Sequence, residues 1–123
     1  MSAYNLKHYA HLGDAVYELF VREYVVERTH SQKQMHDMTT SFVNASFQAQ
    51  MLEALTCEFS EDENEIIRRA KNLPLTVNKR NNQNIHRAAT AFEVIIGYLY
   101  KNEPRKLEEI FMKIREKFNL IDL

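Results

Sequence analysis

Leu12-Gly13-Asp14-Ala15-Val16-Tyr17-Glu18-Leu19-Phe20 is the stretch that decides the fold of this 123-residue chain. Its apolar residues recur every three or four positions, which is the spacing of one buried face of an α-helix. A second apolar series begins at Tyr17 and continues through Val21 to Val25. A helix that is apolar on two faces is buried on both, either in the core or at a subunit interface. The stretch therefore predicts a central helix.

Two serines elsewhere in the chain carry the signals that start helices. Ser31 is followed three residues later by Gln34, and Ser60 is followed in the same way by Glu63. This is the spacing of a capping box, in which the two residues exchange hydrogen bonds between side chain and backbone. We therefore predict that further helices begin at these two serines.

The C-terminal half of the chain adds two more predicted helices after one loop. Residues 73–84 contain Pro74 and the polar run Asn81-Asn82-Gln83-Asn84, so we expect a loop there. Residues 88–100 are almost wholly apolar, and Tyr98, Tyr100 and the phenylalanines are expected in the core or at an interface. Pro104 suits the first turn of a last helix. The sequence thus predicts an all-α fold, as a single domain over residues 1–123.

The composition excludes several other classes of protein. There are only two glycines and two prolines, too few and too scattered for a phosphate-binding glycine loop or a β-sandwich. No apolar run approaches a membrane span, and no signal segment opens the chain. The lone Cys57 forms no internal disulfide and fits a reducing compartment. We expect a soluble, cytoplasmic protein with no membrane contact.

Charge is unevenly distributed along the chain, although the net charge is only −1. Five acids lie within residues 58–65, whereas residues 66–92 contain none. The acid-free segment carries six lysines and arginines: Arg68, Arg69, Lys71, Lys79, Arg80 and Arg87. Charge runs often form an ordinary solvated surface, but clustered cations also bind the phosphates of nucleic acids.

Glu93 is the only charged residue within the apolar segment 88–100. A buried carboxylate without a partner costs several kcal/mol, so such a group is paired, protonated or bound to a metal. A buried pair with Arg87 or Arg22 is one interpretation, and a metal site is another. Its neighbours on the helix are all small: Ala89, Thr90 and Gly97. That face therefore leaves room for another backbone or for a ligand.

Asp14 is the only acid before Tyr17. We expect it at or near the start of its helix, where a capping carboxylate contributes about 1 kcal/mol. Glu18 lies four residues before Arg22, in the order that favours a surface ion pair on a helix. Spacing alone therefore assigns both acids structural roles.

The segments around Asp14 and Glu93 resemble the two motifs of the ribonuclease III family. Residues 12–18 are similar to its signature helix, whose common form reads LEFLGDAVL, and residues 90–100 are similar to its DxFEA motif. The closer resemblance is to the bacterial Mini-ribonuclease III branch, which has the motifs LGDAVYE and STAFEALIGYLY and no double-stranded-RNA-binding domain. Residues 68–72 resemble the RRGRN segment of that branch. The resemblance covers nearly the whole chain.

This resemblance implies an activity and the residues that carry it. Asp14 matches the metal-binding aspartate of the first motif, and Glu93 matches the metal-binding glutamate of the second. The implied protein is a homodimeric, Mg²⁺-dependent endoribonuclease that cuts double-stranded RNA and leaves a 5′-phosphate. Its implied substrate is precursor 23S ribosomal RNA, with a ribosomal protein as a further partner. The six cations of segment 66–92 would then bind the RNA.

The chain also departs from the family pattern. Ala10 and Thr90 stand where the larger enzymes have two further carboxylates, and the Mini-ribonuclease III branch shares both departures. Ala70 replaces the glycine of RRGRN, and His86 and Ala88 replace tyrosines of the branch. With two carboxylates, a non-catalytic RNA-binding scaffold is the alternative function. A helical adaptor that binds no RNA is a third, against which the basic segment argues.

Overall fold

The computed structural model describes residues 5–75 and 82–121, and over these ranges it confirms the predicted all-α fold. In chain order the elements are α1 (Leu6–Val26), α2 (Gln32–Val43), α3 (Ala45–Ala54), the short 3₁₀-helix η1 (Thr56–Glu58), α4 (Glu61–Ala70), α5 (Gln83–Asn102) and α6 (Pro104–Ile121). Within the described residues, no helix has the length and apolar character needed to cross a membrane.

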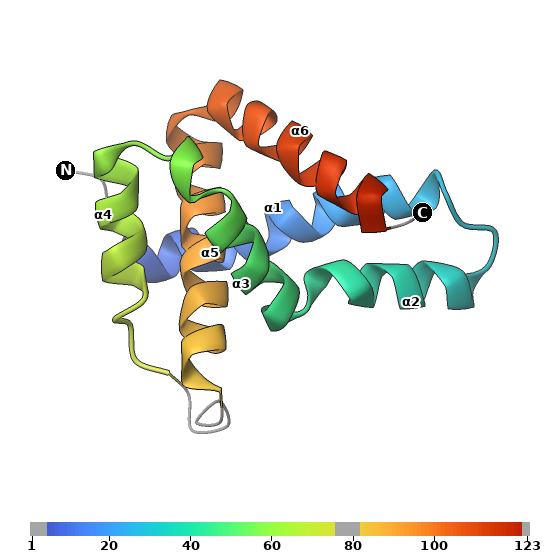
Figure 1. Cartoon of the computed structure of the whole chain (residues 1–123), viewed down its shortest axis with the longest axis horizontal. Coiled ribbons are helices and arrows are strands. Elements are labelled where there is room, and N and C mark those ends of the chain that lie inside the picture. Colours follow the sequence, from blue (N-terminus) through green and yellow to red (C-terminus); the bar gives the residue numbers. More distant parts are fainter. Residues whose placement is uncertain (1–4, 76–81, 122–123) are drawn as a thin grey trace.

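The centre of the molecule is the crossing of α1 and α5. Figure 1 shows α5 standing across α1, with α4 on one side of α5 and α3 on the other. The later turns of α1 run between α2 and α6 (Figure 1). On these two helices the side chains of Val21, Tyr24, Ile95 and Leu99 are completely buried. The apolar series that begins at Tyr17 therefore lies in the core, which is one of the two positions predicted for it.

Stacked aromatic rings attach α6 to the rest of the core. Phe118 stacks on Phe42 of α2, and Phe111 stacks on Phe20 of α1, each pair with ring centroids 4.0 Å apart. The helix begins at Pro104, as predicted, and buries the face that carries Leu107, Ile110, Ile114 and Phe118. This face explains why the last helix lies against α1 and α2.

The predicted helix starts at Ser31 and Ser60 are confirmed. Each serine hydroxyl accepts a hydrogen bond from the backbone N–H three residues later. Ser60 and Glu63 form the complete reciprocal box. The Gln34 carboxamide instead accepts from the backbone N–H of His30. The loop before α5 is shorter than predicted, because this helix already begins at Gln83.

The start of α1 differs from the prediction. Asn5 is the N-cap, and its side chain accepts hydrogen bonds from the backbone N–H groups of Lys7 and His8. The Nδ1 atom of His8 accepts the backbone N–H of Asn5 in return. Since α1 begins at Leu6, Asp14 lies in the interior of the helix. The prediction that Asp14 stands at the helix start was therefore wrong.

A buried carboxylate holds α4 in place. The side chain of Glu63 is almost fully buried, accepts the backbone N–H of Ser60, and pairs with Lys106 of α6. Burial by itself would raise the pKa of Glu63, but the hydrogen bonds from Lys106 and Ser60 hold that pKa below its ordinary value. This pair connects α6 to the helix that carries Arg68 and Arg69 and that ends just before Lys71.

Candidate active site

The helices α1 and α5 touch backbone to backbone where each carries its glycine. A Cβ atom on Gly13 would lie 1.8 Å from the carbonyl oxygen of Glu93, and one on Gly97 would lie 2.0 Å from the carbonyl oxygen of Tyr9. Both distances are far below van der Waals contact, so only glycine fits at either position. The prediction that small residues beside Glu93 leave room for another backbone is confirmed.

This crossing brings the backbone of Glu93 against the residue that precedes Asp14, although the two segments are distant in the sequence. Gly13 rests on the backbone of Glu93, and Asp14 is the next residue of α1. The side chain of Asp14 is exposed, and that of Glu93 is half-buried. The site is therefore open to a large substrate, while its backbone lies within the core.

The arginines considered as partners of Glu93 have other partners in the structure. Arg22 forms the predicted surface pair with Glu18, with Nη2 2.7 Å from Oε2. Arg87 donates from Nη1 to the carbonyl oxygens of Lys71 at 3.0 Å and Leu73 at 3.4 Å. Arg87 thus joins the residues that follow α4 to the first turn of α5.

The donor set at the crossing fits one class of metal ion. Among the described residues, no three or more His, Cys, Asp or Glu side chains are grouped so that they could hold a metal. A site built on Asp14 and Glu93 therefore offers two carboxylates. Zinc takes at least three protein ligands, and calcium takes six to eight oxygens, whereas Mg²⁺ keeps several waters and uses one or two carboxylates plus substrate phosphates. The two carboxylates therefore fit Mg²⁺.

The cations predicted to bind RNA are spread over more than one side of α4. Arg68 is exposed and pairs with Glu65 at 2.6 Å, and its hydrogen bond holds the pKa of Glu65 below the ordinary value. Arg69 and Lys71 line two different cavities. Lys79 and Arg80 lie outside the described residues.

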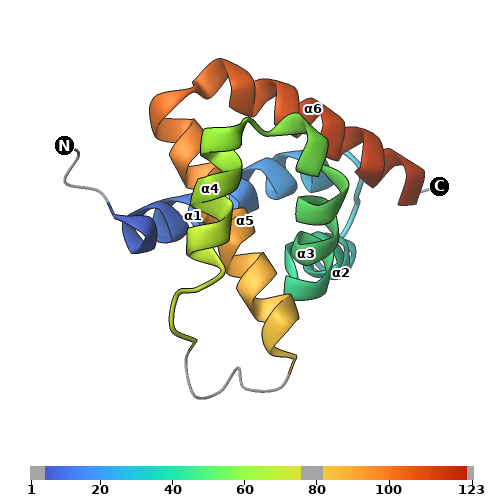
Figure 2. The ribbon, with the colours of Figure 1, turned by 60° about the vertical axis from the view of Figure 1, so that its left-hand side comes forward.

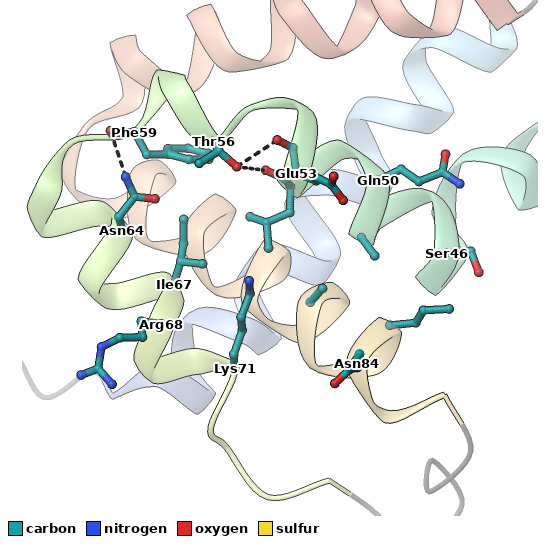
Figure 3. Close-up of a pocket in the computed structure, with 14 residues that line it drawn as sticks. Ser46, Gln50, Glu53, Thr56, Phe59, Asn64, Ile67, Arg68, Lys71 and Asn84 are labelled. Carbon is teal, nitrogen blue, oxygen red and sulfur yellow. Dashed lines mark hydrogen bonds between the residues drawn. The ribbon is translucent and has the colours of Figure 1, made fainter.

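A cavity of about 690 Å³ lies between α3, α4 and α5. Figure 3 shows Lys71 pointing into it, while the guanidinium of Arg68 extends outward. Neither Asp14 nor Glu93 is among its lining residues. The closest lining residue on α5 is Ala88, five residues before Glu93 and therefore about 140° around the helix. This cavity faces a different side of α5 from the two carboxylates.

A second cavity, of about 640 Å³, lies between the first turns of α1, α4 and the later part of α5. It is lined by Lys7 and Arg69 and by the tyrosines Tyr9 and Tyr98, whose rings meet edge to face with centroids 5.5 Å apart. Of these four residues, only Arg69 is a predicted RNA-binding residue. Tyr98 is predicted to lie in the core or at an interface. Sequence reasoning misses this cavity because its walls come from three helices, and no local spacing signals it.

Comparisons with known proteins agree with the motif resemblance. The family model of the Ribonuclease III domain matches residues 7–104. The Mini-ribonuclease 3 of Clostridium tetani is 35% identical over 105 residues, which cover 82% of this chain and 70% of that protein. The Mini-ribonuclease 3 of Thermosynechococcus vestitus is 37% identical over 102 residues, covering 83% and 68%. The crystal structure of a Fusobacterium nucleatum protein, 26% identical, superposes with a TM-score of 0.83 over 94% of each chain.

Proposed function

This chain belongs to the ribonuclease III family, in its Mini-ribonuclease 3 branch, and is an endoribonuclease that acts on RNA. From this premise we propose that it cuts double-stranded RNA with Mg²⁺ held by Asp14 and Glu93. One observation carries the proposal. The proposal is supported by the glycine crossing, where the backbone of Glu93 lies against Gly13, the residue that precedes Asp14. The side chain of Asp14 is exposed and that of Glu93 is half-buried, so the proposed site is open enough to accept an RNA duplex.

The two helices determine how the carboxylates act. When bound, Mg²⁺ lowers the pKa of a water and neutralises charge that develops on the phosphate oxygens. Asp14 and Glu93 supply the negative charge that retains the cation. Because Gly13 rests on the backbone of Glu93, the two carboxylates are anchored on rigid helices before substrate arrives. Preorganised groups need little rearrangement during the reaction. In-line attack by water then leaves a 5′-phosphate and a 3′-hydroxyl.

The proposed enzyme is a homodimer, because one site cuts one strand and a duplex has two. The exposed face of α1 supports this. Leu19 is 60% exposed and Val26 is 59% exposed, and Ala15, one turn before Leu19, is exposed as well. Apolar residues that gather on one exposed helix face mark an interaction surface. Light scattering is expected to give twice the chain mass of 14.6 kDa, and the mass of a single chain would contradict the dimer.

The proposed natural substrate is the paired region at the ends of precursor 23S ribosomal RNA, as the family resemblance implies. A-form RNA is recognised mainly by shape and by contacts to phosphates and 2′-hydroxyl groups. Exposed cations such as Arg69 and Lys71 suit this kind of recognition, because they contact phosphates without reading bases. A ribosomal protein that presents the RNA is the proposed further partner.

Metal dependence is the direct test of the proposed reaction. We expect a long RNA duplex to be cut in Mg²⁺, to stay intact in EDTA, and to be cut again when Mg²⁺ is restored in excess. The products are expected to carry 5′-phosphates, which a phosphate-dependent exonuclease detects. Single-stranded RNA of the same sequence is the control substrate. If neither the duplex nor precursor ribosomal RNA is cut in Mg²⁺, the proposed reaction is refuted and the non-catalytic RNA-binding scaffold becomes the favoured alternative.

Lys71→Gln and Arg87→Gln are expected to affect different properties, namely RNA binding for Lys71→Gln and folding stability for Arg87→Gln. Lys71 is exposed, so its loss should weaken duplex binding and lower the slope of log Kd against log salt by about one. Arg87, which is also predicted to bind RNA, donates to backbone carbonyls, so its loss should cost about 1 kcal/mol of folding free energy, and an unchanged slope would assign it a structural role in place of the predicted one. Salt titrations and urea denaturation measure the two effects. An unchanged slope for Lys71→Gln would remove this residue from the RNA interface.

A further inference from the structure

The cavity between the first turns of α1, α4 and α5 combines the two kinds of side chain that bind single-stranded nucleic acid. Proteins of that kind stack bases on aromatic rings and contact phosphates with nearby cations. The cavity offers Tyr9 and Tyr98 as rings, with the exposed cations Lys7 and Arg69. Figures 1 and 2 both show α4 lying beside the first turns of α1, so the two cations come from neighbouring helices.

The aromatic wall of this cavity is held in place by the fold. The side chain of Asn102 donates from Nδ2 to the hydroxyl oxygen of Tyr9 at 3.2 Å, and Tyr9 meets the ring of Tyr98 edge to face. Burial and the nearby carboxylate of Glu103 raise the pKa of Tyr98, so its hydroxyl stays neutral. The side chains of Leu6 and Ile66 complete an apolar lining. A fixed ring in an apolar setting loses little entropy when a base stacks on it.

The cavity lies close to the proposed active site but opens in another direction. Tyr9 precedes Asp14 by five residues on α1, and Tyr98 follows Glu93 by five residues on α5. Five residues correspond to about 7.5 Å along a helix and about 140° around it. A nucleotide paired within the duplex at Asp14 and Glu93 therefore cannot also occupy the cavity. A strand that has left the duplex can reach it.

We propose that this cavity binds an unpaired nucleotide of the RNA substrate, with its base against Tyr98 and its phosphate near Lys7 and Arg69. The inference rests on the proposed function, because it takes a duplex RNA as the substrate. It adds a second element of recognition, namely a single-stranded tail that continues from the paired region. The enzyme then distinguishes a duplex that ends bluntly from one that is embedded in a longer transcript.

The test compares a blunt RNA duplex with the same duplex carrying a tail of several unpaired nucleotides. Binding is measured in EDTA by fluorescence anisotropy, so that no cleavage occurs. We expect the tail to lower Kd about five- to tenfold in the wild type, the effect of stacking a single base. Tyr98→Leu should abolish this gain, and Tyr98→Phe, which keeps the ring, should retain it. Tyr100→Leu removes an exposed tyrosine of the same helix outside the cavity and is the matched control.

A second variant keeps the proposal testable if Tyr98→Leu alters folding. Lys7→Gln changes only an exposed side chain and is expected to reduce the gain from the tail while blunt-duplex binding stays the same. Cleavage of the blunt duplex in Mg²⁺ separates this inference from the proposed function. If the duplex is cut but the tail gives no gain, or if the gain survives both Tyr98→Leu and Lys7→Gln, the nucleotide cavity is refuted. If no duplex is cut at all, the proposed function itself fails.

Discussion

Asp14→Asn and Glu93→Gln are each expected to slow duplex cleavage by about 10³-fold while RNA binding stays nearly unchanged. Each change removes one negative charge and keeps the size of the side chain. The loss is large because the described residues contain no third carboxylate, histidine or cysteine grouped with these two that could replace the missing ligand. Single-turnover cleavage at saturating enzyme measures the rate, and anisotropy in EDTA measures the binding.

Glu18→Gln is the matched control for this prediction. Glu18 lies one turn beyond Asp14 on the same helix and pairs with Arg22 at the surface. Its replacement is expected to leave the cleavage rate close to that of the wild type, because surface ion pairs contribute little to stability. If Asp14→Asn or Glu93→Gln cuts RNA at the wild-type rate, that residue does not belong to the metal site.

Gly13→Ala and Gly97→Ala are each expected to destabilise the fold by about 3 kcal/mol or more. The added Cβ would meet a backbone carbonyl at 1.8 Å or 2.0 Å, and the backbone of a packed helix cannot turn aside as a side chain can. The helices would have to separate, and Asp14 would move away from Glu93. A fall of about 10 °C or more in Tm, followed by circular dichroism, should therefore accompany the loss of cleavage.

The expected loss of stability is opposite in sign to the usual effect of replacing glycine by alanine in a helix. In a helix without such a contact, replacing glycine by alanine raises stability by about 1 kcal/mol. Ala15→Gly changes an exposed position of the same helix in the opposite direction and is expected to cost only about 1 kcal/mol. A rise in Tm for Gly13→Ala would show that α1 and α5 do not touch at this position.

Local signals explain which parts of the fold could be predicted from the sequence. Ser31, Ser60 and Pro104 lie at the starts of three helices, and the apolar face of the last helix is buried as its spacing indicates. These features depend only on residues within one or two turns of each other. The small residues around Glu93 likewise indicate close approach of another backbone, and the backbone of α1 does approach closely at Gly97.

The start of α1 was missed for a specific physical reason. A capping box is usually completed by glutamate or glutamine, but here the imidazole Nδ1 of His8 accepts the backbone N–H of Asn5. A search for the usual residues passes over this box. The next polar residue that suits a helix start is Asp14, so the sequence pattern predicts a capping role for a residue that lies inside the helix.

Features that depend on several helices could not be predicted. The sequence identifies Arg87 only as a basic residue. Its hydrogen bonds to the carbonyl oxygens of Lys71 and Leu73 depend on how α4 and α5 pack. The cavity lined by Tyr98 and Lys7 has the same origin, since its walls lie far apart in the chain. A metal site shared by Asp14 and Glu93 remains a proposal, and the sequence suggests it only because both segments resemble motifs of one family.

The glycine crossing also has a consequence for the order in which the proposed metal site forms during synthesis of the chain. Gly13 belongs to α1, which leaves the ribosome early, whereas Glu93 and Gly97 belong to α5, which ends at Asn102 of 123 residues. Chains grow from the N-terminus, so a nascent chain that has already formed α1 to α4 still lacks half of the proposed metal site. With this proposed site, cleavage requires the long-range contact between α1 and α5, so an interrupted product that ends before α5 is expected not to cut the RNA around it.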